Sequence, residues 1–350
     1  MKSELPPFRS HILEMAAYHP PLSGRLSSGR MLLDFNERIR PLPDVILKDL
    51  AHWGEAGTSW CYPEYEGLEE VLASYIGCEE ERVFFGNGSD QLLDCVFRAV
   101  VSPGESVLLP TPSFAMYRQL AFLAEAKIED YSLLGENPME VFKKGVEKKP
   151  RMAVICNPNN PTGTLLEPKE LLELFGAHPD VWFLVDEAYA EFSGRSVLEG
   201  GDLDNVVVTR TLSKAFGLAG LRFGFMVAHP LMNEQCGKIR GPYDVNMLAG
   251  QAAKKVMENR EEVLAYRDEV VHRAKPMLED FLRGKDLEFL PSEANFLLLP
   301  SPPQGLLEHM EAQGIRVRKM SQPELEGAFR VSIGDLAATR ECIEAIATFF

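Results

Sequence analysis

The sequence lacks the features of several special protein classes. Its six cysteines, at positions 61, 78, 95, 156, 236 and 342, form no CxxC pair and no regular framework, which is typical of reduced thiols in a cytosol. No apolar run approaches the roughly 18 residues of a membrane span, and the N-terminus, Met-Lys-Ser-Glu-Leu-Pro-Pro, has no apolar signal segment. We therefore expect a cytoplasmic protein, away from membranes, with no metal site.

Basic residues are also scarce. The chain has 36 lysines and arginines against 52 acidic residues, a formal net charge of −16. Such a balance repels nucleic acid and anionic lipid, which argues against both as partners, although a local cationic pocket for a small anion remains possible. An apolar content of 45% with 25% charged residues is typical of a soluble globular protein, and 350 residues suggest about two domains.

Short apolar runs alternate with helical periodicity through most of the chain. The strand-like runs lie at 83–85, 106–109, 152–156, 181–185, 205–208 and 222–227. This alternation predicts an α/β fold whose sheet is covered by helices on both faces and binds ligands beyond the carboxyl ends of its strands.

The composition changes after residue 246, where a long helical region runs to about residue 282 and could bridge two domains. We expect an N-terminal arm and part of a small domain in 1–45, and a large domain in 46–245. The interdomain helix and the rest of the small α/β domain would occupy 246–350.

One lysine, Lys214, lies in the segment Thr-Leu-Ser-Lys-Ala-Phe-Gly-Leu-Ala-Gly-Leu-Arg-Phe-Gly, residues 211–224. A lysine whose pKa is lowered can form a Schiff base with an aldehyde, and small neighbours admit a bulky cofactor. The hydroxyls of Thr211 and Ser213 and the guanidinium of Arg222 can hold a phosphate. Taken alone, this segment favours a solvated surface lysine, and the interpretation as a Schiff-base site depends on the rest of the chain.

Three further segments place polar residues at or directly after the ends of predicted strands. Gly86-Asn-Gly-Ser-Asp90 lies between a strand and a helix, where free N–H groups and the helix dipole favour an anion; the alternative is a polar turn with Ser89 or Asp90 as N-cap. Asn157-Pro-Asn-Asn-Pro-Thr-Gly163 predicts a rigid loop, or more simply a turn.

Asp186 ends the apolar run 181–185 and needs a partner if it is buried. A protonated pyridine nitrogen would be one, with Tyr189 reaching the same ligand, and a helix N-cap is the alternative.

Together these segments resemble fold type I pyridoxal-phosphate aminotransferases, and more narrowly histidinol-phosphate aminotransferases. The blocks follow one another in the family's order, and the similarity extends from about Tyr62 to Arg330. The resemblance implies a large domain with a mostly parallel seven-stranded sheet covered by helices, a small α/β domain, pyridoxal 5'-phosphate as cofactor, and a homodimer with shared active sites. The partners would be an amino donor and a 2-oxo acid.

The resemblance also implies residue roles. Lys214 would bond the cofactor covalently and act as the catalytic base, and Asp186 would face the pyridine nitrogen. The other cofactor contacts it implies are Asn160 and Tyr189 at the ring oxygen, Phe114 stacked on the ring, and Ser89, Asp90, Thr211, Ser213, Arg222 and the neighbouring subunit's Tyr62 at the phosphate. Arg330 would take a substrate carboxylate.

The residues that would determine the substrate lie where this sequence matches the family pattern least well. Tyr18 and Arg318 lie where the family binds the substrate phosphate, but Asn36 and Glu37 match its N-terminal Asn-Glu-Asn-Pro motif only in part. We expect histidinol-phosphate/2-oxoglutarate transamination in histidine biosynthesis. The alternatives are an aromatic amino acid aminotransferase, a threonine-phosphate decarboxylase-like enzyme, or a non-catalytic ligand sensor with the same fold.

Overall fold

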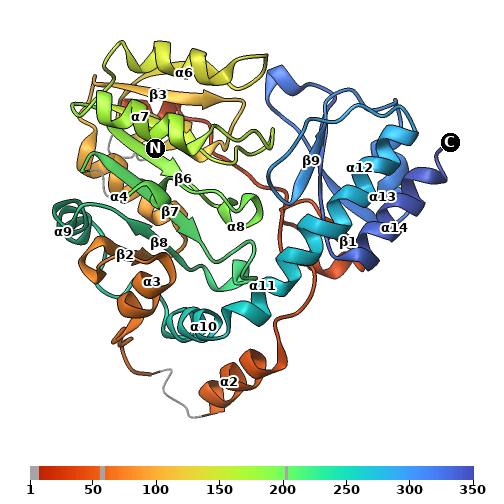
Figure 1. Cartoon of the computed structure of the whole chain (residues 1–350), viewed down its shortest axis with the longest axis horizontal. Helices are drawn as coiled ribbons and strands as arrows, with labels where there is room; N and C mark the ends of the chain where they lie inside the picture. The colour runs from red at the N-terminus through yellow and green to blue at the C-terminus, as the bar shows by residue number, and fades with distance from the viewer. Residues whose placement is uncertain (1–7, 56–59, 202–203) are drawn as a thin grey trace, which may run out of the picture.

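The computed structural model of the chain describes residues 8–55, 60–201 and 204–350. Within these ranges the strands form two sheets, one of seven strands and one of four (Figure 1). No helix in the described ranges is long and apolar enough to cross a bilayer.

The larger sheet has seven strands in the order β2-β8-β7-β6-β5-β3-β4. All neighbours pair in parallel except β8, which is antiparallel to both β2 and β7. The strands are β2 (Val83–Gly86), β3 (Ser106–Thr111), β4 (Lys127–Ser132), β5 (Met152–Cys156), β6 (Trp182–Asp186), β7 (Val206–Thr211) and β8 (Gly224–Val227). The mostly parallel α/β sheet expected from the sequence is confirmed.

Both faces of this sheet are buried, because alternate residues of a strand point to opposite sides. On β5, Met152 and Val154 pack with the helices of one face, whereas Ala153 and Ile155 pack with those of the other. The first face is covered by α4 (Ser89–Val100), α5 (Met116–Leu123) and α9 (Pro230–Ile239). The second is covered by α6 (Pro138–Val146), α7 (Pro168–Ala177), α3 (Leu68–Ile76) and α10 (Met247–Glu258).

The smaller sheet has the order β1-β10-β11-β9, in which β1 is parallel to β10 and β11 is antiparallel to both neighbours. Its strands are β1 (Met31–Leu33), β9 (Phe296–Leu299), β10 (Ile315–Lys319) and β11 (Phe329–Ser332). The helices beside it are α12 (Lys275–Gly284), α13 (Leu306–Ala312) and α14 (Leu336–Ala347). The first strand therefore joins a sheet whose other strands lie some 260 or more residues later in the chain.

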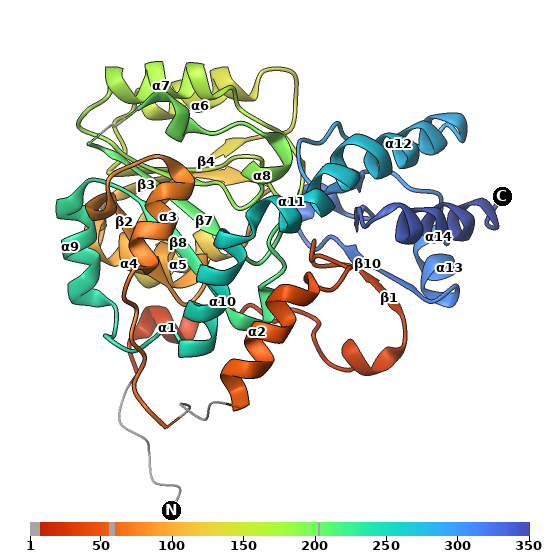
Figure 2. The same ribbon diagram turned by 60° about the horizontal axis from the view of Figure 1, so that its bottom comes forward.

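A nearly continuous helical run connects the two sheets. It consists of α11 (Arg260–Glu269), a π-helical turn at Val270–Ala274, and α12. Figures 1 and 2 both show α11 passing between the sheets and α12 lying against the smaller one. The short helices α1 (Ser10–Glu14), α2 (Asp44–Glu55) and α8 (Ala190–Ser193) complete the described α-helices.

This topology gathers several loops at one place. The parallel strands β3, β5, β6 and β7 all end at the same edge of the larger sheet, where a doubly covered sheet binds its ligands. The smaller sheet contributes β10 and β11 to the same region, since Arg318 and Arg330 line a cavity with residues from those strand ends.

Candidate active site

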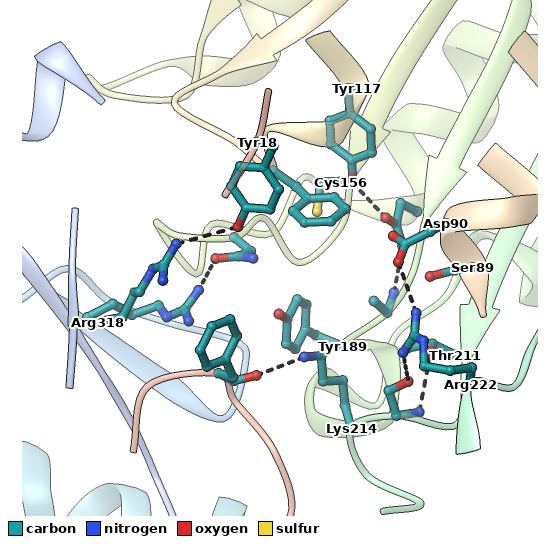
Figure 3. A pocket seen from close by; sticks show the side chains of 17 residues that line it. Tyr18, Ser89, Asp90, Tyr117, Cys156, Tyr189, Thr211, Lys214, Arg222 and Arg318 are labelled. Atoms are coloured by element: carbon teal, nitrogen blue, oxygen red, sulfur yellow. Dashed lines mark hydrogen bonds and ion pairs between the residues drawn. The ribbon is translucent and has the colours of Figure 1, made fainter. Parts of the chain in front are cut away.

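The cavity at the carboxyl edge of the larger sheet measures about 760 Å³, including its open mouth. Figure 3 shows it from close by, with Tyr18 and Arg318 on one side, Ser89, Asp90, Thr211 and Arg222 on the other, and Tyr189 and Lys214 between them. The predicted site residues that line it are Tyr18, Ser89, Asp90, Phe114, Asn160, Asp186, Tyr189, Thr211, Ser213, Lys214, Arg222, Arg318 and Arg330. All predicted site residues except Tyr62 thus meet in one cavity.

Lys214 follows β7 in a tight turn that includes Gly217, whose φ of +75° is in the left-handed region that favours glycine. Its Nζ donates a hydrogen bond to the backbone oxygen of Phe35 at 2.8 Å. Burial, with a smaller contribution from the guanidinium of Arg330, lowers the pKa of Lys214 to about 8. A lysine in this state is partly neutral near physiological pH and can act as a nucleophile or a base.

Asp186 is the last residue of β6 and is 3% exposed. Its Oδ2 accepts from the hydroxyl of Tyr117 at 2.6 Å, and its Oδ1 accepts from the N–H of Ala188 at 3.1 Å. Burial raises the pKa of Asp186 to about 6, and these hydrogen bonds act in the opposite direction. The N-cap alternative is wrong, since Tyr189 caps α8. A carboxylate held this way suits a cationic N–H from a ligand.

The start of α4 and the turn after β7 form one end of the cavity. Arg222 donates from Nη2 to Asp90 at 2.9 Å and from Nη1 to the Ser213 hydroxyl at 3.4 Å. Gly88 has φ +77°, and a Cβ on it would lie 2.6 Å from Arg222 Nη2, so this approach requires glycine. Gly88 also caps α4, which corrects the alternative of Ser89 or Asp90 as N-cap.

Helix N–H groups, hydroxyls and a guanidinium therefore converge at this end, an arrangement that suits a phosphate.

The opposite end contains two arginines on neighbouring strands. Arg318 of β10 and Arg330 of β11 are register partners across an antiparallel pair. Arg330 donates to the Asn160 side-chain oxygen and to the backbone oxygen of Asp34, the latter at 2.7 Å. Arg318 donates to the Tyr18 hydroxyl at 3.4 Å. Among the described residues, Arg318 Nη1 and Arg330 Nε are buried without a hydrogen-bond acceptor.

The middle of the cavity is lined by Phe114, Asn160 and Tyr189. The Tyr189 hydroxyl accepts from the side-chain amide of Asn36 at 3.0 Å, which leaves its own proton available to a ligand. The residues that would hold the ring of pyridoxal phosphate therefore line the same cavity as Asp186 and Lys214. The side chains present fit the cofactor that the resemblance implies.

Tyr62 lies elsewhere in this chain. Its side chain is 73% exposed and stacks on Tyr243, with ring centroids 4.3 Å apart. The structure does not bring it to the cavity of its own chain, and its role in a neighbouring subunit stays a prediction.

Four residues of the cavity escaped the sequence reasoning. Phe35 supplies the carbonyl that holds Lys214, and Cys156, Tyr117 and Ala188 line the cavity near Asp186. Phe35 and Cys156 carry no local signal, because each belongs to an apolar run. Tyr117 carries none either, because Phe114 lies before α5 begins at Met116 and the i, i+3 spacing of a helix does not relate the two residues.

A family model described as "Aminotransferase class I and II" matches residues 25–346. The chain belongs to this family. It is 34% identical over 334 residues to a histidinol-phosphate aminotransferase of Thermoanaerobacter sp. (strain X514), a match that covers 91% of this chain and 92% of the relative. A second histidinol-phosphate aminotransferase, from Caldanaerobacter subterraneus subsp. tengcongensis, is 30% identical over 99% of this chain and 97% of its own length.

The fold is also that of solved aminotransferases. The histidinol-phosphate aminotransferase of Sinorhizobium meliloti, solved in complex with pyridoxal-5'-phosphate, superposes with a TM-score of 0.87 at 21% identity and covers all of both chains. The expected PLP-dependent transferase architecture is thereby confirmed.

Proposed function

We propose that this chain is a pyridoxal-phosphate-dependent aminotransferase that transfers the amino group of histidinol phosphate to 2-oxoglutarate, in the biosynthesis of histidine. The names of relatives 30–34% identical over most of the chain support the activity. The cavity supports the cofactor, because it combines a lysine of lowered pKa, a buried carboxylate and a phosphate-binding end.

The observation that carries the substrate is the pair Arg318 and Arg330. Like charges directly opposite each other on antiparallel strands destabilise a sheet. Each guanidinium also has a buried N–H without an acceptor among the described residues, and such groups require an explanation. An anion bound between the two arginines offsets their repulsion and accepts from the N–H groups that have no acceptor. A phosphate can accept from two guanidinium groups at once.

The side chains then have definite tasks. Arg222, Ser213 and the start of α4 would hold the cofactor phosphate, and Asp186 would accept from the ring nitrogen. When bound, the cofactor supplies an electron sink for the electrons left behind as the donor loses its α-proton. Lys214 takes that proton as a general base and returns it as a general acid. The same residues serve the second half-reaction in reverse, with glutamate and 2-oxoglutarate.

We also propose a cytoplasmic homodimer with shared active sites. Trp60, Tyr62 and Tyr243 are 80%, 73% and 55% exposed, and aromatic side chains in such numbers are favoured at protein interfaces. Tyr62 on this surface supports a contact with the neighbouring subunit's cofactor phosphate.

The decisive experiment is a single-turnover assay on the purified protein with its cofactor. Stopped-flow absorbance should show the cofactor band bleaching fastest with histidinol phosphate, compared with phenylalanine, tyrosine and threonine phosphate. A faster reaction with the aromatic amino acids would contradict the substrate. Release of carbon dioxide from threonine phosphate would indicate a decarboxylase, and no bleaching with any donor would favour a ligand sensor.

A further inference from the structure

Tyr117 of α5 is a buried tyrosine to which no role has been assigned above. Its side chain is 1% exposed, lines the cavity, and donates to Asp186 Oδ2 at 2.6 Å (Figure 3). Its ring packs edge-on against Phe114, with centroids 5.6 Å apart. It therefore touches both Phe114 and Asp186, the aromatic ring and the carboxylate that would contact a bound cofactor ring.

The two oxygens of Asp186 each accept one hydrogen bond from the protein. Tyr117 donates to Oδ2, and the N–H of Ala188 donates to Oδ1. A carboxylate offers about four acceptor positions, so positions remain for a ligand on the side that lines the cavity. Two donors on different oxygens fix the plane of the carboxylate as well as its position.

Besides Tyr117, two groups favour the charged form of Asp186: the N–H of Ala188 and, to a smaller extent, the hydroxyl of Thr209, its register partner on β7. The titratable groups near it are Tyr117 from α5, Cys156 from β5, Asp90 from α4, Tyr189 after β6, and Lys214 and Arg222 in the cavity wall. Burial raises the pKa values of the Cys156 thiol and the Tyr189 phenol to about 12, so both are neutral. Asp90 opposes ionisation of Asp186, and its charge is already paired with Arg222.

The next residue, Glu187, is paired with Arg210 and offers no proton to Asp186. Burial holds the pKa of Tyr117 well above its usual value, so its phenol stays a neutral donor across the physiological range. Of the side-chain groups around Asp186, Tyr117 makes the closest hydrogen bond and favours the charged form.

We propose that Tyr117 is a positioning residue for the cofactor ring, whose hydroxyl keeps the Asp186 carboxylate ionised and correctly oriented to accept from the protonated ring nitrogen. The inference rests on the proposed function, because it takes pyridoxal phosphate as the ligand. Tyr117 acts through Asp186, so its loss should affect only interactions that depend on the ring nitrogen.

The test compares Tyr117→Phe with a matched variant, Tyr131→Phe. Tyr131 of β4 is also buried, at 2% exposed, and its hydroxyl donates to the backbone oxygen of Val154 at 2.9 Å. It does not line the cavity. The full-length protein, stripped of cofactor, would be titrated across about pH 5 to 9 with pyridoxal phosphate and with its deaza analogue, in which carbon replaces the ring nitrogen. Equilibrium dialysis gives both dissociation constants without reference to activity.

Tyr117→Phe should move the acid limb of the binding curve up by about one pH unit, since a hydrogen bond to a charged group is lost, and so weaken pyridoxal phosphate binding about 5-fold at pH 6, approaching ~10-fold at pH 5. Binding above about pH 8 should be close to wild type, which also shows that the variant is folded. The deaza analogue should bind the variant and the wild type equally, and Tyr131→Phe should change neither ligand.

A double-mutant cycle tests independently whether Tyr117 acts through Asp186. In an Asp186→Asn background, Tyr117→Phe should have little further effect, because the carboxylate through which it acts is gone. Equal losses for both ligands, a similar loss in Tyr131→Phe, or additive effects in the cycle would overturn the inference and leave Tyr117 as a packing residue. Failure of the wild type to bind pyridoxal phosphate would instead overturn the proposed function.

Discussion

Replacing Arg318 with alanine should reduce catalysis and leave the free protein at least as stable. The side chain has one buried N–H with no acceptor among the described residues; its guanidinium lies over the Phe35 ring, donates to Tyr18 and faces a second cation, Arg330. A charge-assisted hydrogen bond to a substrate phosphate is worth about 1.5–3 kcal/mol. Its loss should therefore lower kcat/KM for the histidinol phosphate half-reaction about 10- to 150-fold.

The free energy of unfolding of the cofactor-free Arg318→Ala variant should rise or stay constant. Burial lowers the pKa of Arg330, and Arg318 lowers it further. The two guanidiniums face each other across the strand pair, a repulsion of about 0.2–1 kcal/mol that alanine removes. The assay is stopped-flow bleaching of the cofactor with histidinol phosphate and, separately, with glutamate, together with thermal unfolding of the cofactor-free protein. Glutamate should lose less, since Arg330 alone can dock its carboxylate.

Arg283→Ala is the control for loss of one positive charge, because this side chain is 57% exposed on α12, where it forms ion pairs with Glu279 and Asp280 and lies over the Phe289 ring. It should change neither half-reaction. Equal losses with both donors in Arg318→Ala would refute the phosphate site, and a melting temperature lowered by several degrees would refute the view that the two arginines are held against their mutual repulsion.

Three further predictions concern the cofactor. Lys214→Ala should bind pyridoxal phosphate without a covalent bond and lose transamination; full activity in this variant, assayed with the same donors, would remove Lys214 from its assigned role. Covalent capture of the cofactor by the stripped wild-type protein should accelerate as pH rises through about 8 and then level off, because the neutral amine is the nucleophile and burial lowers the Lys214 pKa to that value; a stopped-flow rate that is flat across this range would contradict the lowered pKa. Mixing inactive Tyr62→Ala with inactive Lys214→Ala should restore partial activity in hybrid dimers, and no complementation after verified subunit exchange would argue against a shared site.

Strands buried on both faces were predictable because their apolar runs are continuous. The run expected at 152–156 coincides with β5, and the run expected at 181–185 lies within one residue of β6. Strand β4 was missed for the converse reason: it forms the edge of the sheet, and its sequence Lys-Ile-Glu-Asp-Tyr-Ser has no continuous apolar run. The domain boundaries expected near residues 45 and 245 remain predictions.

The cavity was predictable where its residues follow strand ends in sequence, as Asp186 and Lys214 do. Contacts made across the chain were not. The carbonyl of Phe35 meets Lys214 across 179 residues, and the Tyr18 hydroxyl meets Arg318 across 300. Asn36 shows the difficulty most clearly, because it takes a left-handed φ of 55° and hydrogen-bonds Ser332, Tyr189 and Asn295. No periodicity or composition encodes such a position, since every partner is distant in sequence.

The charges of the cavity favour an anionic substrate independently of the family. The chain carries a net −16, yet its cavity is lined by four cations, Lys214, Arg222, Arg318 and Arg330, and by two carboxylates, Asp90 and Asp186. Asp90 pairs with Arg222 at the end proposed for the cofactor phosphate, and Asp186 faces the proposed position of the ring nitrogen. The excess positive charge therefore lies at the far end, with Arg318 and Arg330. An acidic protein that concentrates cations at the mouth of a cavity attracts small anions to it and repels larger polyanions from the rest of its surface, which makes a phosphorylated amine a better fit than a neutral aromatic amino acid.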